Sequence, residues 1–169
     1  MNREKSIHML ASRRRSHAGF SLIELLVVVA VILIIAAIAI PNYIQSKMRA
    51  NEASAVQSLR NLTTAELVYS TTYGVDFTPA LTQLSGTGVN PDASAAGLID
   101  EVLAGGVKQG YTFTYTPLTY DASGNTATYS ISADPITPNV TGQRHFYTDQ
   151  SCVIRANVAV PAGPTDLPI

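Results

Sequence analysis

The residues with the most specific chemistry stand together at the start of a long apolar run. Glu24 comes directly before sixteen consecutive apolar residues, Leu25 to Ile40. An acidic side chain in such a segment costs up to ~3 kcal/mol at the middle of a membrane and less near the interface. A charge kept at this cost indicates a function, and the chemistry indicated is the pairing of a carboxylate with a cation.

The cation that we predict for Glu24 is created by proteolysis. If the chain is cut after Gly19, the new α-amino group of Phe20 lies about one helical turn from the carboxylate. The pair either forms within one chain or, in an assembly of parallel helices, joins Glu24 of one subunit to Phe20 of its neighbour. In the second case an unpaired charge is costly at low dielectric, so the pair sets the register between subunits.

Residues suited to catalysis are few. Two of the three histidines, His8 and His17, lie in the polar N-terminal segment, and His145 lies in a predicted strand. The sequence shows no nucleophile elbow. We therefore predict no catalytic residue and no enzymatic activity.

Metal and disulfide chemistry are not indicated either. Asp134, Asp149 and Asp166 offer oxygen ligands but lack the clustered spacing of a calcium loop. The single cysteine, Cys152, excludes an intramolecular disulfide and a cysteine-based zinc cluster. We expect no metal and no cofactor. For Cys152 we expect a buried or half-buried thiol at the edge of a turn, with a link between subunits as the alternative.

Charge is divided unequally around the apolar run. Residues 1–19 carry five basic residues and one acidic residue, a net charge of +4, which leaves −5 for the rest of the chain. This asymmetry orients a membrane segment with its N-terminus in the cytoplasm. The acidic remainder argues against nucleic-acid binding through a general basic surface, and nucleic acid is otherwise left open as a partner.

Three interpretations of the apolar run compete: a cleaved secretory signal, a permanent transmembrane helix, and the core helix of a soluble protein. A helix that is apolar on all sides leaves no polar face for water, which disfavours the core helix. Ala37, Ile38 and Ala39 have the small-x-small form that signal peptidase prefers, and cleavage there leaves Ile40 as the new N-terminus. Glu24 argues against this cleavage, because a discarded signal has no use for a carboxylate.

The segment after the apolar run predicts a helix with one buried face. Apolar residues recur at helical spacing from Asn42 to Tyr73, and Gly74 is the predicted stop. Glu66 is the one charge on this face, whose other members include Ala55, Leu59, Leu62, Tyr69 and Tyr73. Glycine and proline then punctuate a connector with a short helix expected around residues 93–103.

Strand patterns follow the connector. Tyr111, Phe113 and Tyr115 alternate with threonines, a period of two with aromatic residues on one face. The tail from Val160 to Ile169 is rich in proline and predicts an irregular or loose end. The remaining strands are predicted at residues 126–133, 145–148 and 153–158.

The predicted fold class is α+β. A long N-terminal helix, membrane-spanning in its first half, packs by its second half on a roughly four-stranded antiparallel sheet. The predicted segments are a cleaved leader, a hydrophobic transmembrane and assembly helix, an amphipathic helix half, a variable loop between helix and sheet, the sheet and an irregular tail, at residues 1–19, 20–41, 42–73, 74–109, 110–160 and 161–169.

The sequence from Gly19 to Leu25, after a basic leader and before an apolar run, resembles the class III signal of type IV pilins and the related pseudopilins. The likeness continues through Pro41-Asn42-Tyr43, and the last predicted hairpin, Phe146 to Arg155, resembles the C-terminal strands of these proteins. The single Cys152 is a departure, since many pilins close their C-terminal region with a disulfide.

The resemblance implies roles for four residues. It implies cleavage after Gly19 by a prepilin peptidase and N-methylation of Phe20. It assigns Glu24 to docking into the growing fibre and Pro41 to the place where the helix of the family kinks or melts on assembly. The alternative for Pro41 is the end of the membrane segment.

The resemblance also implies partners and a location. The subunit waits in the bacterial inner membrane as a single-pass protein, surrounded by lipid, until assembly machinery with an extension ATPase packs copies into a helical homopolymer outside the cell. We therefore expect a structural subunit of a type IV pilus. The alternatives are a major pseudopilin of a type II secretion system and, outside the family, a secreted or membrane-anchored domain behind an ordinary signal sequence.

Overall fold

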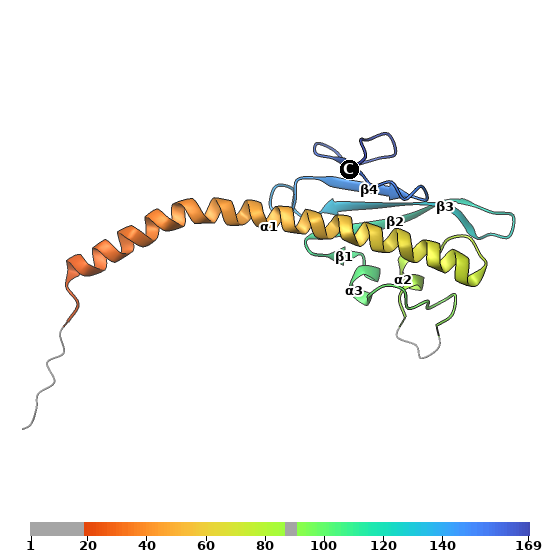
Figure 1. Ribbon diagram of the computed structural model, residues 1–169, viewed down its shortest axis with the longest axis horizontal. Helices are drawn as coiled ribbons and strands as arrows, with labels where there is room; N and C mark the ends of the chain where they lie inside the picture. The colour runs from red at the N-terminus through yellow and green to blue at the C-terminus, as the bar shows by residue number, and fades with distance from the viewer. Residues whose placement is uncertain (1–18, 87–90) are drawn as a thin grey trace, which may run out of the picture. The chain divides into compact units, whose positions relative to one another are not determined.

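The computed structural model describes residues 19–86 and 91–169 (Figure 1). The chain divides into two compact units, Met1–Ile40 and Pro41–Ile169, and each is described by itself. Apart from Gly19, the predicted leader lies outside the described residues.

The first unit is the beginning of helix α1, which runs from Leu22 to Tyr73. Every side chain from Leu22 to Val29 is exposed, and the apolar residues beyond, as far as Ile40, are almost all exposed as well. The helix is long and apolar enough to cross a membrane by length and composition. An apolar surface of this extent marks a segment that is covered by lipid or by other chains.

Helix α1 ends where the sequence predicts. Gly74 has a φ of +65°, a left-handed conformation that glycine adopts without a steric penalty. Its N–H donates to the carbonyl of Ser70 at 3.1 Å, which completes the last turn. Pro41, which we expected at a kink or at the end of the membrane segment, lies inside α1.

The second unit contains an antiparallel sheet of five strands in the order of the chain. These strands are β1 (Val107–Lys108), β2 (Tyr111–Tyr120), β3 (Thr126–Pro135), β4 (His145–Asp149) and β5 (Arg155–Asn157). The α+β class is confirmed, and the sheet has five strands where we expected roughly four. Strand β1 escaped prediction because two residues are too few to show a period of two.

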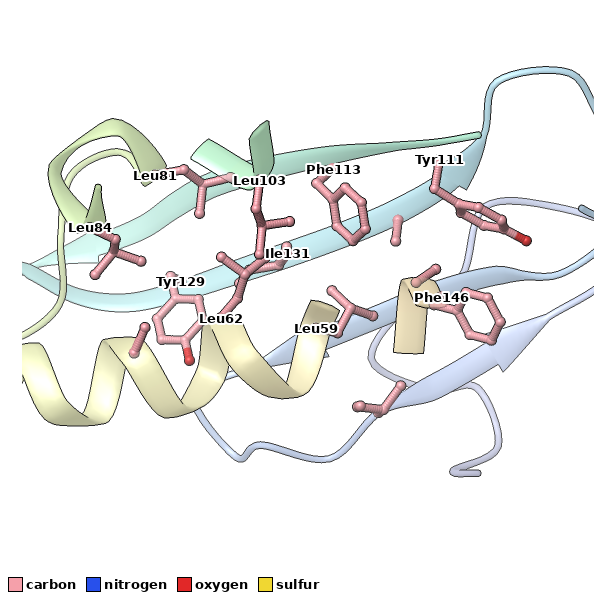
Figure 2. Packing of buried hydrophobic residues seen from close by; sticks show 14 of the residues in the cluster. Leu59, Leu62, Leu81, Leu84, Leu103, Tyr111, Phe113, Tyr129, Ile131 and Phe146 are labelled. Atoms are coloured by element: carbon pink, nitrogen blue, oxygen red, sulfur yellow. The ribbon is translucent and has the colours of Figure 1, made fainter. Parts of the chain in front are cut away.

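The core lies between one face of this sheet and residues 55–73 of α1, as Figure 2 shows. Tyr111 and Phe113 of β2 are buried while the threonines between and after them are exposed, so the predicted alternation is confirmed. Leu59 and Leu62 of α1 are fully buried and face Ile131 of β3. The second unit, Pro41–Ile169, which we call the head, is therefore held together by an amphipathic helix packed on one face of a sheet.

The connector has more regular structure than its sequence predicts. Helix α2 (Leu81–Leu84) was not expected, and α3 (Glu101–Ala104) covers only the end of the helix predicted at residues 93–103. Most of that prediction is wrong, because Asp92 instead forms a turn, its Oδ1 accepting from the N–H groups of Ser94 and Ala95. A helix of one turn is too short to leave a 3.6-residue pattern in the sequence.

The C-terminal tail is irregular, but hydrogen bonds around Asp166 hold it to the sheet. The carboxylate of Asp166 accepts from Nδ2 of Asn157 at 2.9 Å and from the N–H of Gly163 at 2.8 Å. Its carbonyl accepts from Nη1 of Arg155 at 2.9 Å. These bonds fix the tail in a chain with one cysteine, so the expectation of a loose end is wrong.

Cys152 is exposed, which corrects the expected buried or half-buried thiol. The residue lies between β4 and β5 with a φ of +59°. Its N–H donates to the carbonyl of Asp149 at 2.9 Å, so the turn holds the backbone and leaves the side chain in solvent.

The backbone of Gly142 lies so close to the ring of Tyr111 that there is no room for a side chain. A Cβ at this position would meet the ring of Tyr111, with Cζ at 2.7 Å. Tyr111 is fully buried and donates from its hydroxyl to the carbonyl of Arg144 at 2.8 Å. We expect Gly142→Ala to lower the free energy of unfolding of the head by about 1–3 kcal/mol, as overpacking does.

This loss is measured as a lower melting temperature of the full chain in detergent micelles, followed by the near-ultraviolet circular dichroism of its tyrosines. Gly163→Ala is the matched control, because a Cβ there meets nothing within 4 Å. Equal melting temperatures for Gly142→Ala and the native chain would contradict the predicted clash.

Candidate functional site

The first turn of α1 is closed by a reciprocal pair of side chains. Ser21 precedes the helix, and its Oγ accepts from the N–H of Ile23 at 3.4 Å. In return, Oε2 of Glu24 accepts from the N–H of Ser21 at 2.8 Å. This is a capping box, Ser-x-x-Glu, in which each side chain satisfies a backbone donor that the helix leaves without a partner.

Glu24 therefore has a structural role, as a helix cap, in addition to the predicted pairing with a cation. We expected a partner for its carboxylate only after cleavage, yet in the uncleaved chain the backbone already supplies one. The signal was present in the spacing of Ser21 and Glu24 ahead of an apolar run. The positive end of the helix dipole also favours a carboxylate in this turn.

The cap uses only part of the capacity of the carboxylate. Oε1 of Glu24 has no hydrogen-bond partner among the described residues, and an ionised carboxylate accepts about four hydrogen bonds. A shallow hollow of ≈ 400 Å³ lies beside it, lined by Phe20, Ile23, Glu24, Val27 and Val28. The start of α1 thus presents an anionic group on an otherwise apolar surface, which suits an incoming cation on an apolar chain.

Pro41 removes one backbone donor from the interior of α1. Without the N–H of residue 41, the carbonyl of Ala37 lacks its usual partner one turn later. The structure keeps the helix through this point, so Pro41 weakens α1 locally without ending it.

A second carboxylate of α1, Glu66, is fully buried in the head. Its Oε2 accepts from the N–H of Thr78 at 3.0 Å, and its Oε1 accepts from the Thr78 hydroxyl at 2.6 Å. Tyr115 of β2 donates to the carbonyl of Thr78 at 2.6 Å. Glu66 therefore joins helix, connector and sheet through one residue.

The environment of Glu66 favours its neutral form. Burial raises the pKa of this carboxyl above its ordinary value of 4.5, although the hydrogen bonds from Thr78 act in the opposite direction. No basic side chain pairs with Glu66 in the part of the chain that the structure describes. Burial also raises the pKa of Tyr115, so its hydroxyl stays protonated and remains a donor.

A third carboxylate, Glu52, binds the segment that leads into β4. Its Oε1 accepts from the N–H of Gln143 at 2.9 Å, and its Oε2 accepts from Nε of Arg144 at 2.8 Å. Burial acts to raise the pKa of Glu52, but the hydrogen bonds from Gln143 and Arg144 outweigh it and hold the pKa below its ordinary value. Glu52 and Glu66 thus lie on the same buried face of α1, but the pKa of Glu52 is lowered and that of Glu66 is raised.

Glu52 was not among the residues predicted from the sequence. The spacing of Met48, Glu52, Ala55 and Leu59 continues the buried face toward the N-terminus in steps of three and four residues. That extension was the available signal. The position of Arg144 gave none, since its pairing joins residues 92 apart in the sequence.

Other candidate residues are placed without forming a site. Asp134 pairs with Nδ1 of His145 at 2.5 Å across β3 and β4. Asp149 shapes the turn after β4, and Asp166 holds the tail. Within residues 19–86 and 91–169, no group of three or more histidine, cysteine or acidic side chains is placed to hold a metal ion.

The architecture and the capped, apolar helix start define a class of protein. A long N-terminal helix followed by an antiparallel sheet is consistent with the α+β fold of pilins. Residues 14–40 match the family model of the prokaryotic N-terminal methylation motif, which covers the start of α1.

Among curated proteins, the chain is similar to the type IV major pilin protein PilA of Myxococcus xanthus (strain DK1622). The two are 52% identical over 48 residues, which is 28% of this chain and 22% of the relative. The matched part thus spans about a fifth of the relative. The motif and this identity together support a type IV pilin or prepilin.

Proposed function

We propose that this chain is the precursor of a structural subunit of a type IV pilus, cleaved after Gly19, N-methylated at Phe20 and polymerised through its N-terminal helix. The observation that carries the proposal is a helix start that is exposed and apolar on all sides except for the single carboxylate of Glu24. The methylation motif over residues 14–40 supports the same reading.

The exposed helix requires two successive environments. Before assembly, lipid covers the side chains from Leu25 to Ile40, since an apolar surface of this extent is costly in water. In the fibre, the same side chains pack against those of neighbouring copies. Lipid tails are as apolar as these side chains, so transfer from lipid to fibre gains little from the hydrophobic effect, and packing and charge pairing supply the specificity.

The roles proposed for the site residues follow from this sequence of events. Gly19 gives the prepilin peptidase a residue without a side chain at the cut. Cleavage turns the N atom of Phe20 into an amine, and Glu24 accepts the amine of a neighbouring copy. Pro41 marks the weak point of α1 where the helix gives way on assembly.

The proposed partners are further copies of this chain, the prepilin peptidase, and inner-membrane machinery with an extension ATPase. The basic leader holds the N-terminus in the cytoplasm, and the head lies on the opposite side of the membrane. After assembly the subunit is extracellular. The relative's name, a type IV major pilin, favours a pilus over a secretion pseudopilus.

The mature N-terminus tests the proposal directly. We expect the intact mass of the chain from cells with a prepilin peptidase to correspond to a chain that begins at Phe20 with one added methyl group. The full precursor is expected when the peptidase is absent or when Gly19 is replaced by valine. A mature chain that begins at Ile40 would assign the apolar run to an ordinary signal sequence and overturn the proposal.

Electron microscopy of sheared surface fibres, labelled with an antibody to this chain, distinguishes the two kinds of fibre. A type IV pilus predicts long labelled fibres on wild-type cells. Processing without such fibres, together with a defect in protein secretion when the chain is deleted, would favour the pseudopilin of a type II secretion system.

A further inference from the structure

The second unit contains a polar groove of ≈ 390 Å³ between α1 and the segments that flank the last two strands. Its walls come from three parts of the chain that only folding brings together. They are the turns of α1 just after the apolar run, the segment before β4 and the segment after β5, through Gln45, Met48, Arg49, Glu52, Gln143, Arg144 and Val158.

The groove carries a net positive charge in a chain that is otherwise acidic. Two guanidinium groups, Arg49 and Arg144, line it with one carboxylate, Glu52. The sequence after residue 19, with the groove residues included, has a net charge of −5. The groove is therefore a local exception to the charge of the head.

The carboxylate of Glu52 occupies only one edge of Arg144. Nε of Arg144 donates to Glu52, whereas its two Nη atoms have no hydrogen-bond partner among the described residues. The guanidinium carbon lies over the ring of Phe146, 5.3 Å from its centroid, a second contact that limits the orientation of the group. The free Nη edge is thus oriented in advance for an external oxygen pair, which a guanidinium binds in a bidentate manner.

Arg49 supplies the second cation. It is exposed and has no hydrogen-bond or ion-pair partner in residues 19–86 and 91–169. The side-chain amides of Gln45 and Gln143 add donors to the same groove. Two guanidinium groups with amide donors around a polar hollow fit a tetrahedral oxyanion better than a planar apolar ligand.

The position of the groove in the sequence identifies the source of that oxyanion. Arg49 follows Ile40 by nine residues, so its Cα lies at most about 32 Å from that of Ile40 even if the intervening chain were fully extended. If Leu25 to Ile40 spans a membrane, the phosphate layer begins where that run ends. The chain length thus limits the separation between Arg49 and this phosphate layer to about 32 Å, which makes lipid phosphate the nearest abundant oxyanion before assembly.

We propose that this groove binds the phosphodiester of an anionic membrane lipid and docks the head on the bilayer while the subunit waits for assembly. The inference rests on the proposed function only for the membrane insertion of the apolar run. A second copy with an acidic side chain in the groove is the competing occupant, and the experiment below separates the two.

The test uses the full chain in vesicles, with a fluorescent donor on the single, exposed Cys152 and a trace of lipid that carries an acceptor on its headgroup. Cys152 lies beyond the opposite end of β4 from Arg144, so the label does not enter the groove. The vesicles contain phosphatidylcholine alone or phosphatidylcholine with phosphatidylglycerol. Flotation of the vesicles first establishes that the chain is inserted.

We expect more energy transfer in the vesicles with phosphatidylglycerol. General electrostatics predicts the reverse, because a head with net negative charge is repelled by an anionic surface. Arg49→Gln should reduce the transfer to the level in phosphatidylcholine alone. Arg60→Gln, the same change of charge on α1 at a residue that does not line the groove, should leave it unchanged.

Arg49 is the residue to change because it holds no other side chain in place, whereas loss of Arg144 would strand the buried Glu52. Near-ultraviolet circular dichroism confirms that each variant keeps its fold. Equal transfer in both vesicles, equal loss in the two variants, or a loss that tracks self-association instead of lipid composition would overturn the proposal. Failure of the chain to float with the vesicles would instead contradict the membrane segment of the proposed function.

Discussion

Glu24→Ala is expected to abolish fibre assembly while membrane insertion and cleavage after Gly19 continue. The variant removes the only charge from an apolar helix start, which favours residence in lipid. In the proposed fibre, the variant leaves the amine of Phe20 of a neighbouring copy without the partner that we propose for it. Removing one member of a buried ion pair costs about 3–5 kcal/mol, and this cost recurs at every subunit.

Two further substitutions separate the proposed charge pair from the helix cap that the structure shows. Glu24→Gln keeps an oxygen for the N–H of Ser21 and so preserves the capping box, but it removes the charge. Ser21→Ala weakens the cap by about 1 kcal/mol and keeps the carboxylate. We expect Glu24→Gln to fail in assembly as Glu24→Ala does and Ser21→Ala to assemble.

The measurements are the yield of sheared fibres, the mature mass and the membrane fraction of each variant. Normal fibre yield with Glu24→Gln would show that the cap, not the charge, is what assembly needs. Loss of processing in Glu24→Ala would also count against the assigned role, because the carboxylate would then act before assembly.

Glu66→Ala is expected to be the most destabilising single change in the head. It removes the acceptor of two donors of Thr78, the N–H and the hydroxyl, at a fully buried position. Each buried donor left without a partner costs about 1–3 kcal/mol, and the lost side chain also leaves a cavity. Since Tyr115 is bonded to Thr78, the loss extends to β2.

Glu66→Gln is the matched control, because it retains the volume, one acceptor oxygen and a donor that the Thr78 hydroxyl oxygen accepts. We expect it to cost much less than Glu66→Ala. Urea unfolding of the full chain in detergent micelles, followed by tyrosine circular dichroism, measures the difference. Equal losses in the two variants would mean that packing, and not the hydrogen bonds to Thr78, holds this region.

The raised pKa of Glu66 also predicts a dependence of stability on pH. The folded head binds the proton of this carboxyl more tightly than the unfolded chain does, because burial raises the folded pKa above 4.5. The contribution of Glu66 to the free energy of unfolding therefore falls as the pH rises from about 4.5 to the folded pKa, and is constant above it. Glu66→Gln should abolish this slope.

Glu52 predicts the opposite sign in a different window. Its folded pKa lies below 4.5, so its stabilising contribution is complete above that pH and is lost as the pH falls through the folded value. The two carboxylates can therefore be separated in one titration. A slope above pH 4.5 that survives in Glu66→Gln would contradict the assignment to Glu66.

Several features of this protein follow from local sequence alone. The apolar run from Leu25 to Ile40 predicts a helix covered by lipid or by other chains without any knowledge of tertiary contacts. Every side chain in it is apolar, so no face of the helix favours water. The alternation of Tyr111, Phe113 and the following threonines predicts one buried face of a strand. Gly74 predicts the end of α1 because its left-handed conformation is a local property.

Other features were settled by tertiary structure because they depend on contacts between distant residues. In the sequence, Glu66 is an unexplained charge on an apolar helix face. The structure explains it, because the N–H and the hydroxyl of Thr78 both donate to its carboxylate. The composition of the tail predicts a loose end, but in the structure Asp166 accepts hydrogen bonds from Asn157 and Gly163 and holds it. In each case a polar side chain is explained only by the partner that folding brings to it.

The carboxylates of α1 show which features the sequence predicts and which require the tertiary structure. The sequence by itself showed that Glu24 is a charge beside an apolar run, and from this we predict a cation as its partner, since the cost of burying a carboxylate depends on its neighbours along the chain. The structure showed that Ser21 and Glu24 form the capping box that their spacing allows, and only the structure showed that Arg144 is the partner of Glu52. Charge and periodicity are properties of the local sequence, whereas the hydrogen bonds that satisfy a buried group depend on residues that only the folded chain brings together.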